Sequence, residues 1–246
     1  MKLTGEVISN SLSHINPLGE RELILRVGNH VDLKIPAIEN LGVTKDLNDA
    51  LDFTNNDLRV LGNFPRLMRL QHLLLTKNRI SKIETGLGET IPNVQRIILT
   101  NNSIHELGDL EPLTELKQLT HLSVMDNPVT KKQHYRLYLI HKLPNLRVLD
   151  FNKVSLAERQ KAAQMFTKED GTANDLSKSI TENKTKTFEP GEGMNNDTTD
   201  TSNAGHALTP EEQLKIKEAL KQATSLDEIS RLERLLKAGH VPATQK

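Results

Sequence analysis

The chain has nine histidines, a residue type that can bind a metal ion or assist a nucleophile. Two of them, His72 and His121, occupy equivalent positions of a repeated motif. The chain has no cysteine, and none of the histidines follows the H-E-x-x-H spacing of a zinc site. The sequence also lacks the phosphate-binding motif G-x-x-x-x-G-K-[ST] and the nucleophile motif G-x-S-x-G. We therefore expect no metal site, no cofactor and no catalytic residue, and we predict that the protein is not an enzyme.

The overall composition argues against a free-standing nucleic-acid-binding protein, a disulfide-bonded protein and a membrane-spanning protein. Lysine and arginine total 32 and aspartate and glutamate total 32, so the net charge gives no support for free-standing nucleic-acid binding. The absence of cysteine excludes a disulfide framework and favours an intracellular protein. The first residues, MKLTGEVISNSLSHINPLGE, lack an apolar signal-peptide core, and no run approaches the roughly 18 apolar residues of a membrane span.

Asparagines recur along the chain within a fixed pattern of apolar residues. This repeated pattern indicates the strands and turns on which His72, His121 and their neighbours lie. The frame L-x-x-L-x-L-x-x-N-x-I fits around Asn78, Asn102 and Asn127, and a partial copy surrounds Asn56 with its first apolar position displaced to Leu47. Successive asparagines are 22 to 25 residues apart, within the roughly 20 to 29 residues of a leucine-rich repeat. Because an amide carries both a donor and an acceptor, we predict that these four side chains are structural and pair buried backbone groups of neighbouring turns.

This period predicts an α/β fold, a leucine-rich-repeat solenoid of about five or six repeats with N-terminal and C-terminal caps over residues 1–166. A short helix over residues 4–12 is expected at the first end, and a helix capped by Ser155 at the last. Residues 167–207 have the composition of a flexible linker. Residues 208–240 carry two capped apolar segments that predict a small helical hairpin, and residues 241–246 are expected to be a disordered end.

A stack of this kind exposes the side chains that alternate with its strand leucines, so we predict a protein-binding surface on the concave face. Leu74 and Ile98 occupy matching positions there, with Met125 two residues further along its strand. They suggest an apolar strip, bordered by charges, that suits an amphipathic helix or the edge of a small domain. The alternative is that Leu74 and Ile98 merely fill a tightly curved inner surface. The predicted partner-binding residues are Asp52, Thr54, His72, Leu74, Thr76, Lys77, Arg96, Ile98, Thr100, His121, Ser123, Met125, Asp126, Asp150 and Lys153.

Basic residues flank the repeats and are candidates for contacts with RNA phosphates. They are Arg21, Arg26 and Lys34 near the first strand, and Lys131 and Lys132 after the last complete repeat. Most charge clusters are solvated surface, so we expect any RNA contact to be auxiliary to a protein partner.

Four stretches resemble one family in their order and spacing. They are PAIENLGVTKDLNDALDFTNNDL, IILTNNSIHELGDLEPL, NPVTKKQHYRLYLIHKLPNLRVLDFNKV with ERQKAAQMF, and KTFEPGEG. Together they resemble the A-prime family of the U2 small nuclear ribonucleoprotein (snRNP) over about residues 3–193. The chain departs from that family where VGNHVDL intervenes between Arg26 and Lys34, so the resemblance does not carry the family's RNA contacts over to this edge.

The resemblance implies a non-enzymatic spliceosomal subunit that acts in pre-mRNA splicing in the nucleus. It implies pairing with an RNA-recognition-motif protein of the B-double-prime type, one helix of which lies in the repeat concavity, and contact with other spliceosomal proteins. It also implies that this subunit helps the partner to bind a hairpin of U2 snRNA.

A second function remains open from the residues alone. Intracellular leucine-rich-repeat proteins also serve as regulatory subunits of a protein phosphatase or of another enzyme. Such a regulator is expected to have a longer array with acidic and aromatic concave residues, whereas aromatic residues make up 3% of this chain.

Overall fold

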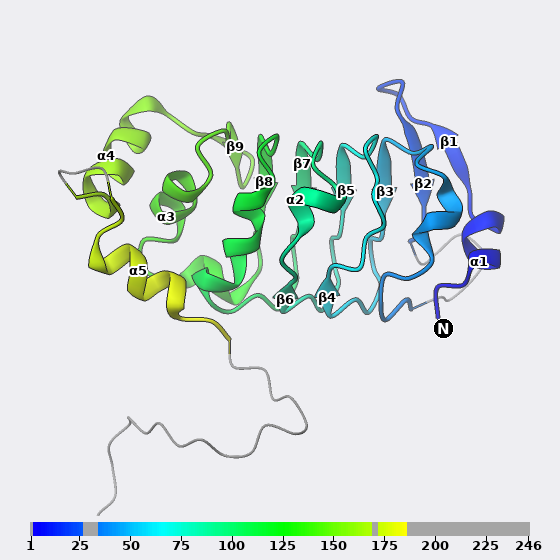
Figure 1. Cartoon of the computed structure of the whole chain (residues 1–246), viewed down its shortest axis with the longest axis horizontal. Helices are drawn as coiled ribbons and strands as arrows, with labels where there is room; N and C mark the ends of the chain where they lie inside the picture. Colours follow the sequence, from blue (N-terminus) through cyan, green and yellow to red (C-terminus); the bar gives the residue numbers. More distant parts are fainter. Residues whose placement is uncertain (1, 27–33, 169–171, 186–246) are drawn as a thin grey trace, which may run out of the picture. The chain divides into compact units, whose positions relative to one another are not determined.

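The computed structural model describes residues 2–26, 34–168 and 172–185. Within these ranges the strands of the main sheet lie in the order β1-β2-β3-β5-β7-β8-β9-β10, and β4 and β6 form a second, two-stranded sheet (Figure 1). The strands are β1 Ser13–Ile15, β2 Arg21–Ile24, β3 Ala50–Asp52, β4 Val60–Leu61, β5 His72–Leu74, β6 Lys82–Ile83, β7 Arg96–Ile98, β8 His121–Ser123, β9 Val148–Leu149 and β10 Asn152–Lys153. The helices are α1 Gly5–Asn10, η1 Leu41–Thr44, α2 Leu87–Thr90, η2 Leu107–Glu115, η3 Pro128–Lys131, α3 Tyr135–Lys142, α4 Leu156–Phe166 and α5 Asp175–Glu182.

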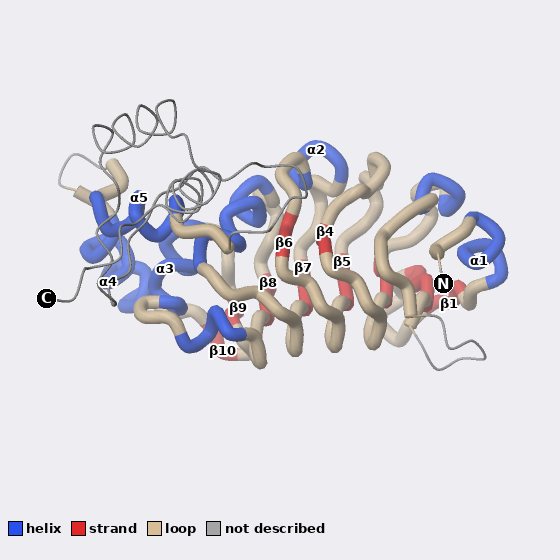
Figure 2. Tube along the Cα trace, turned by 90° about the horizontal axis from the view of Figure 1, so that it is seen from below, coloured by secondary structure: helices blue, strands red, loops and turns tan. Residues whose placement is uncertain are grey.

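The inner strands of the main sheet, from β2 to β9, pair in parallel with no slip in register. Leu51, Leu73, Ile97 and Leu122 are adjacent across the strands and are buried, so one side chain per repeat enters the core at the same level. The main sheet lies along one side of the repeats, and α2, β4 and β6 lie on the other (Figure 2). The prediction of a leucine-rich-repeat solenoid of about five or six repeats is confirmed.

The repeat asparagines form a continuous ladder of hydrogen bonds. Asn102 shows the pattern: its Oδ1 accepts from the backbone N–H of Ile80 at 3.0 Å, and its Nδ2 donates to the carbonyl oxygens of Leu75 and Leu99 at 2.9 Å. Asn78 and Asn127 repeat these bonds one turn earlier and one turn later. At the first end, Asn56 accepts from Ile35 and donates to Leu25 and Phe53. Each amide thus joins two neighbouring turns of the backbone, as its chemistry predicts.

The N-terminal cap consists of α1, the antiparallel β1–β2 hairpin and η1. The side chain of Thr4 caps α1 by accepting from the backbone N–H of Val7, which agrees with the expected helix over residues 4–12. The apolar position assigned to Leu47 is wrong, because Leu47 is exposed and the neighbouring Asn48 is buried. Asn48 accepts a hydrogen bond from the Ser13 hydroxyl, so a polar contact between cap and repeat replaces the leucine.

The C-terminal cap is held by Arg136, which links three segments. Its guanidinium donates to Glu158 of α4 at 2.6 Å and to the carbonyl oxygens of Leu149 and Lys153. The expected capping box of α4 is present, since the backbone N–H of Ser155 donates to Glu158 and that of Glu158 to the Ser155 hydroxyl. The Arg136 hydrogen bond and the Ser155 N–H lower the pKa of Glu158 from its ordinary 4.5 to about 2.

A Glu158→Gln variant should therefore lose stability in a pH-dependent way. Because the folded-state pKa lies below the unfolded one, the carboxylate contributes its full stabilisation above about pH 4.5 and loses it as the pH falls towards 2. We expect the variant to be about 1 kcal/mol less stable at pH 7, with the difference narrowing towards pH 2. Urea unfolding at pH 7, 4 and 2.5 measures this, and a constant difference at all three pH values would contradict the assignment.

Helix α5 corrects the predicted domain boundaries, because residues 175–182 of the predicted linker are helical and pack on η2 of the repeat domain. Asn174 caps α5, the Thr181 hydroxyl lies 3.0 Å from the Tyr138 hydroxyl, and Thr185 bonds to Asp109. Few apolar side chains take part, so composition alone concealed the helix. Within the described residues, the compact unit therefore extends through residue 185 instead of ending at residue 166. Residues 169–171 and 186–207 of the predicted linker, the hairpin over 208–240 and the end over 241–246 lie outside the described residues.

Gly108 of η2 provides a test of this packing. A methyl group on Gly108 would come closer than 3 Å to the carbonyl oxygens of Thr181 and Asn183, so Gly108→Ala should detach the segment after α5 from η2. We expect faster amide exchange over residues 175–185 and unchanged exchange in the repeat strands. Gly42→Ala is the matched control, because a methyl group there meets nothing within 4 Å. Unchanged exchange over 175–185 in Gly108→Ala would show that the segment does not pack as described.

Candidate protein-binding face

The main sheet has one face on the core and an opposite face, termed here the outer face, which corresponds to the predicted concave surface. Its side chains form three rows that run across the strands. The first row contains His72, Arg96 and His121, and the second contains Asp52, Leu74, Ile98 and Ser123. Backbone hydrogen bonds extend the register to a third row of Thr54, Thr76, Thr100 and Met125. The structure thus brings most of the predicted binding residues onto one face.

The second row carries the apolar strip. Leu74 and Ile98 are adjacent in the β5–β7 register and both are partly exposed. Towards the first end of the sheet the row continues through Asp52 to Ile24, whose backbone N–H donates to the carbonyl oxygen of Leu12, the residue just before β1. Ile24 and Leu12 were missed from the sequence, although Leu23 and Leu25 repeat the L-x-L spacing that places Leu74 between Leu73 and Leu75.

The first row gives the apolar strip a basic border. Burial lowers the pKa of His121, and the charges of Arg96, His72 and Arg147 lower it further, so the imidazole is neutral at pH 7. Arg96, between the two histidines, carries a permanent positive charge. The Nε2 of His72 donates to Glu20 at 2.7 Å, because a carboxylate can only accept. The row therefore presents one guanidinium beside Leu74 and Ile98.

Three predicted contact residues are buried side chains with internal roles. Ser123 is 1% exposed and its hydroxyl lies 3.0 Å from that of Thr100, while Asp52 is 3% exposed and accepts from the backbone N–H of Thr54. His72 is also buried against Glu20. The alternation of side chains along a strand predicted the correct face for them but not how deeply each side chain is buried. Because they are buried, we do not propose them as contacts with a partner.

Asp150 also serves the fold. Its carboxylate accepts from the Tyr135 hydroxyl and from the backbone N–H of Val124, both at 2.8 Å. Burial and the neighbouring Asp150 charge raise the pKa of Tyr135 well above its ordinary value. Asp150 is therefore the polar residue that closes the last repeat. The remaining predicted residues at the carboxyl ends of the strands, Lys77, Met125, Asp126 and Lys153, are exposed.

The predicted RNA-proximal residues fall into two separate groups. Arg21, Arg26 and Lys34 are exposed near β2, and Arg26 lies 3.7 Å from Asp52. Lys131 and Lys132 are exposed after β8, and Lys132 Nζ lies 2.5 Å from a Glu106 carboxylate oxygen. Since four strand spacings separate β2 from β8, roughly 19 Å, the two groups cannot contact the same phosphate.

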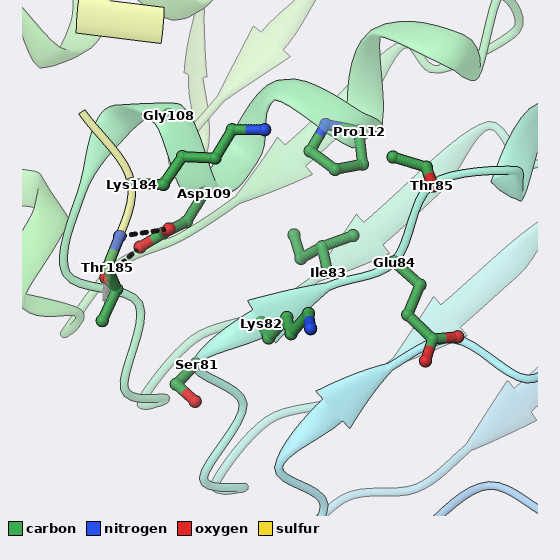
Figure 3. Close-up of a pocket in the computed structure, with 10 residues that line it drawn as sticks. All are labelled: Ser81, Lys82, Ile83, Glu84, Thr85, Gly108, Asp109, Pro112, Lys184 and Thr185. Atoms are coloured by element: carbon green, nitrogen blue, oxygen red, sulfur yellow. Dashed lines mark hydrogen bonds between the residues drawn. The ribbon is translucent and has the colours of Figure 1, made fainter. Parts of the chain in front are cut away.

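A cavity of about 460 Å³ lies away from the outer face, between β6 and η2 (Figure 3). Its lining includes Lys82, Glu84, Asp109, Lys184 and Thr185. Asp109 is largely buried and accepts from the Thr185 backbone N–H and hydroxyl, as the dashed lines in Figure 3 show. These bonds and one from the backbone N–H of Glu106 occupy the Asp109 carboxylate, which therefore has a structural role in joining residues 183–185 to η2. In the described ranges no group of three or more histidine, aspartate or glutamate side chains could hold a metal ion.

Comparisons with known proteins give the family of the chain. The leucine-rich-repeat family matches residues 1–181. The human U2 small nuclear ribonucleoprotein A′ is 46% identical over all 246 residues, which cover 91% of the human protein. The chain belongs to the U2 small nuclear ribonucleoprotein A′ family. The resemblance found in the sequence is confirmed, and this A′ family member is a spliceosomal U2 snRNP subunit.

Two further relatives support the A′ assignment over most of the chain. The U2 small nuclear ribonucleoprotein A′ of Schizosaccharomyces pombe is 45% identical over 98% of this chain and 100% of the fission yeast protein. A chain in the crystal structure of the Drosophila melanogaster SNF/U2A′ complex is 48% identical, with a TM-score of 0.67 over 73% of this chain and 99% of that chain. The fold described above is therefore that of a solved A′ protein.

Proposed function

We propose that this U2 snRNP subunit binds an RNA-recognition-motif protein of the B-double-prime type through the outer face of its main sheet. By this contact it supports the partner's binding to a hairpin of U2 snRNA during pre-mRNA splicing in the nucleus. The observation that carries the proposal is the row in which Ile24, Leu74 and Ile98 lie at one level of the sheet beside Arg96.

The spacing of this row suits a helix of the partner. Neighbouring strands lie about 4.8 Å apart, and an α-helix advances about 5.4 Å per turn. A helix lying across the strands therefore places an apolar side chain, at intervals of three or four residues, over successive strands. Asp52 is too deeply buried to interrupt this contact, and Arg96 favours an acidic residue on the adjoining edge of the helix.

The comparison with solved structures supports the same proposal. The Drosophila relative was crystallised in a complex of SNF and U2A′, so an A′ chain of this fold forms a protein complex. The family membership favours this function over the alternative of a phosphatase regulatory subunit.

In this proposal the exposed basic residues make only auxiliary contacts with the RNA. Arg26 lies near Asp52 and Lys132 is paired with Glu106, so part of the positive charge of each group is already balanced within the chain, and the partner should make most of the RNA contacts. The supporting effect then arises because the A′ chain orders the partner in its RNA-binding form.

Calorimetric titration of this chain with the RNA-recognition-motif protein of the same organism tests the proposed contact. We expect a one-to-one complex and a negative heat-capacity change, because apolar surface is buried. The absence of binding in the presence and absence of the RNA hairpin would overturn the proposal.

A further inference from the structure

The N-terminal cap exposes more apolar surface than the end of a repeat array requires. Terminal repeats usually present a polar outer face, which keeps the stack soluble. Here Leu12 is 55% exposed, Ile15 59% and Leu18 69%, all on or beside β1. Val43 and Leu47, in the adjoining loop and η1, are exposed as well.

The backbone of β1 also has one unused edge. The N–H of Ile24 donates to Leu12 and the N–H of Asn16 donates to the carbonyl of Glu20, so Leu12, His14 and Asn16 direct their backbone groups towards β2. By the alternation of an antiparallel ladder, the N–H and C=O groups of Ser13 and Ile15 point the other way. The sheet ends at β1 in the described part of the chain, so these groups are free to pair with a further strand.

A shallow groove adjoins this edge. Its volume is about 220 Å³, and its lining combines the apolar side chains of Ile8, Leu23, Val43 and Leu47 with Arg21 and with serine, threonine and asparagine side chains, among them Ser13. A strand added to β1 would send alternate side chains towards this groove and towards the outer face. Edge, groove and exposed apolar residues together form a site for an extended polypeptide.

The size of the site argues against a second copy of this chain. Stable interfaces between proteins bury about 1,200 to 2,000 Å² in total, and a strand of three residues cannot supply that area alone. A short segment binds usefully when it is tethered to something already bound nearby, since a flexible tether gives an effective concentration of about 1 mM.

The register of the sheet indicates which bound protein acts as the tether. Leu12 lies beside Ile24, and Ile24 belongs to the apolar row assigned to the partner helix. A segment of the partner that continues past Leu12 from the outer face therefore lies next to the free edge of β1. We propose that an extended segment flanking the RNA-recognition motif of the partner adds to β1 as a further strand. This inference rests on the proposed function and extends its interface.

Two measurements on the complete chain test the added strand. The first compares the affinities of the whole partner and of the partner trimmed to its RNA-recognition motif. We expect the whole partner to bind roughly tenfold more tightly. Ile15→Lys should remove this advantage and leave the affinity of the trimmed partner unchanged, because a lysine blocks strand addition at an edge. Leu156→Lys, at another exposed leucine, is the matched control and should keep the advantage.

The second measurement is amide exchange within the complex. The amides of Ser13 and Ile15 should slow when the whole partner binds, and the His14 amide, already directed towards β2, should change little. Equal affinity of whole and trimmed partners would overturn the added strand while leaving the proposed function intact. Protection of Ser13 and Ile15 at high protein concentration without the partner would also overturn it, in favour of self-pairing. If neither form of the partner binds, the proposed function fails and this inference fails with it.

Discussion

The Ile98→Glu variant should bind the RNA-recognition-motif partner roughly 100-fold more weakly than the natural chain. Ile98 is the last apolar residue of the second row before Ser123, next to Leu74 and beside Arg96. A helix packed there would have to bury a carboxylate against its apolar side chains and would compete with that carboxylate for Arg96, and charging a contact of this kind costs about 3 kcal/mol. Calorimetric titration of the variant with the partner measures the loss.

The fold should tolerate this change. The Ile98 side chain is partly exposed on the outer face, whereas its neighbour Ile97 fills the core. Leu156→Glu is the matched control, because Leu156 is exposed at the start of α4, where a carboxylate favours the helix. Met125→Glu, in the third row, should give a smaller loss than Ile98→Glu. Natural affinity in Ile98→Glu would place the partner elsewhere on the chain.

Asn102→Ala should lower the free energy of unfolding by about 3 kcal/mol. The backbone N–H of Ile80 loses its acceptor, and a buried donor left unpaired costs about 1 to 3 kcal/mol. The carbonyls of Leu75 and Leu99 keep one bond each, from Asn78 and Asn127, so their loss is about 1 kcal/mol or less apiece. The midpoint of thermal unfolding should fall by roughly 6 to 12 °C.

Two companion variants separate the amide's role from general damage to the repeats. Asn145→Ala removes one hydrogen bond at the surface, from Nδ2 to the Lys117 carbonyl, and should cost under about 1 kcal/mol. Asn102→Asp keeps the shape of the side chain but replaces the donor with a carboxylate oxygen facing two carbonyl oxygens. It should destabilise the chain at least as much as Asn102→Ala at pH 7, and an aspartate as stable as asparagine would contradict the ladder.

The repeats could be predicted because their constraints are local and periodic. One leucine frame sets which side chains enter the core, and an asparagine in each turn satisfies the backbone groups that the frame leaves buried. The capping box at Ser155 and Glu158 is likewise contained in four residues. Such features need no knowledge of distant parts of the chain.

The depth of each outer-face residue could not be predicted in the same way. Strand alternation places Ser123 and Asp52 on the outer face, yet a short side chain between larger neighbours becomes covered. Asp150 was assigned to binding by its position in the repeat, because its contact with Tyr135, fifteen residues earlier, is not visible in the sequence. These roles depend on neighbours that are brought together only in the folded chain.

Helix α5 was concealed for a related reason. It packs on η2 through contacts such as Thr181 with Tyr138 and Thr185 with Asp109, which a search for apolar periodicity does not detect. The asparagine cap at Asn174, followed by Asp175, was the available signal of a helix start. A reading based on caps as well as composition would have extended the domain beyond residue 166.

We propose that this A′ chain binds an RNA-recognition-motif partner on its outer face and thereby supports the partner's binding to U2 snRNA. A titration of the U2 snRNA hairpin with that partner, alone and with this chain, at one fixed salt concentration tests this proposal. We expect tighter or more selective binding with the natural chain and with Leu156→Glu, and no such effect with Ile98→Glu. Hairpin binding that is the same with and without the natural chain would contradict it.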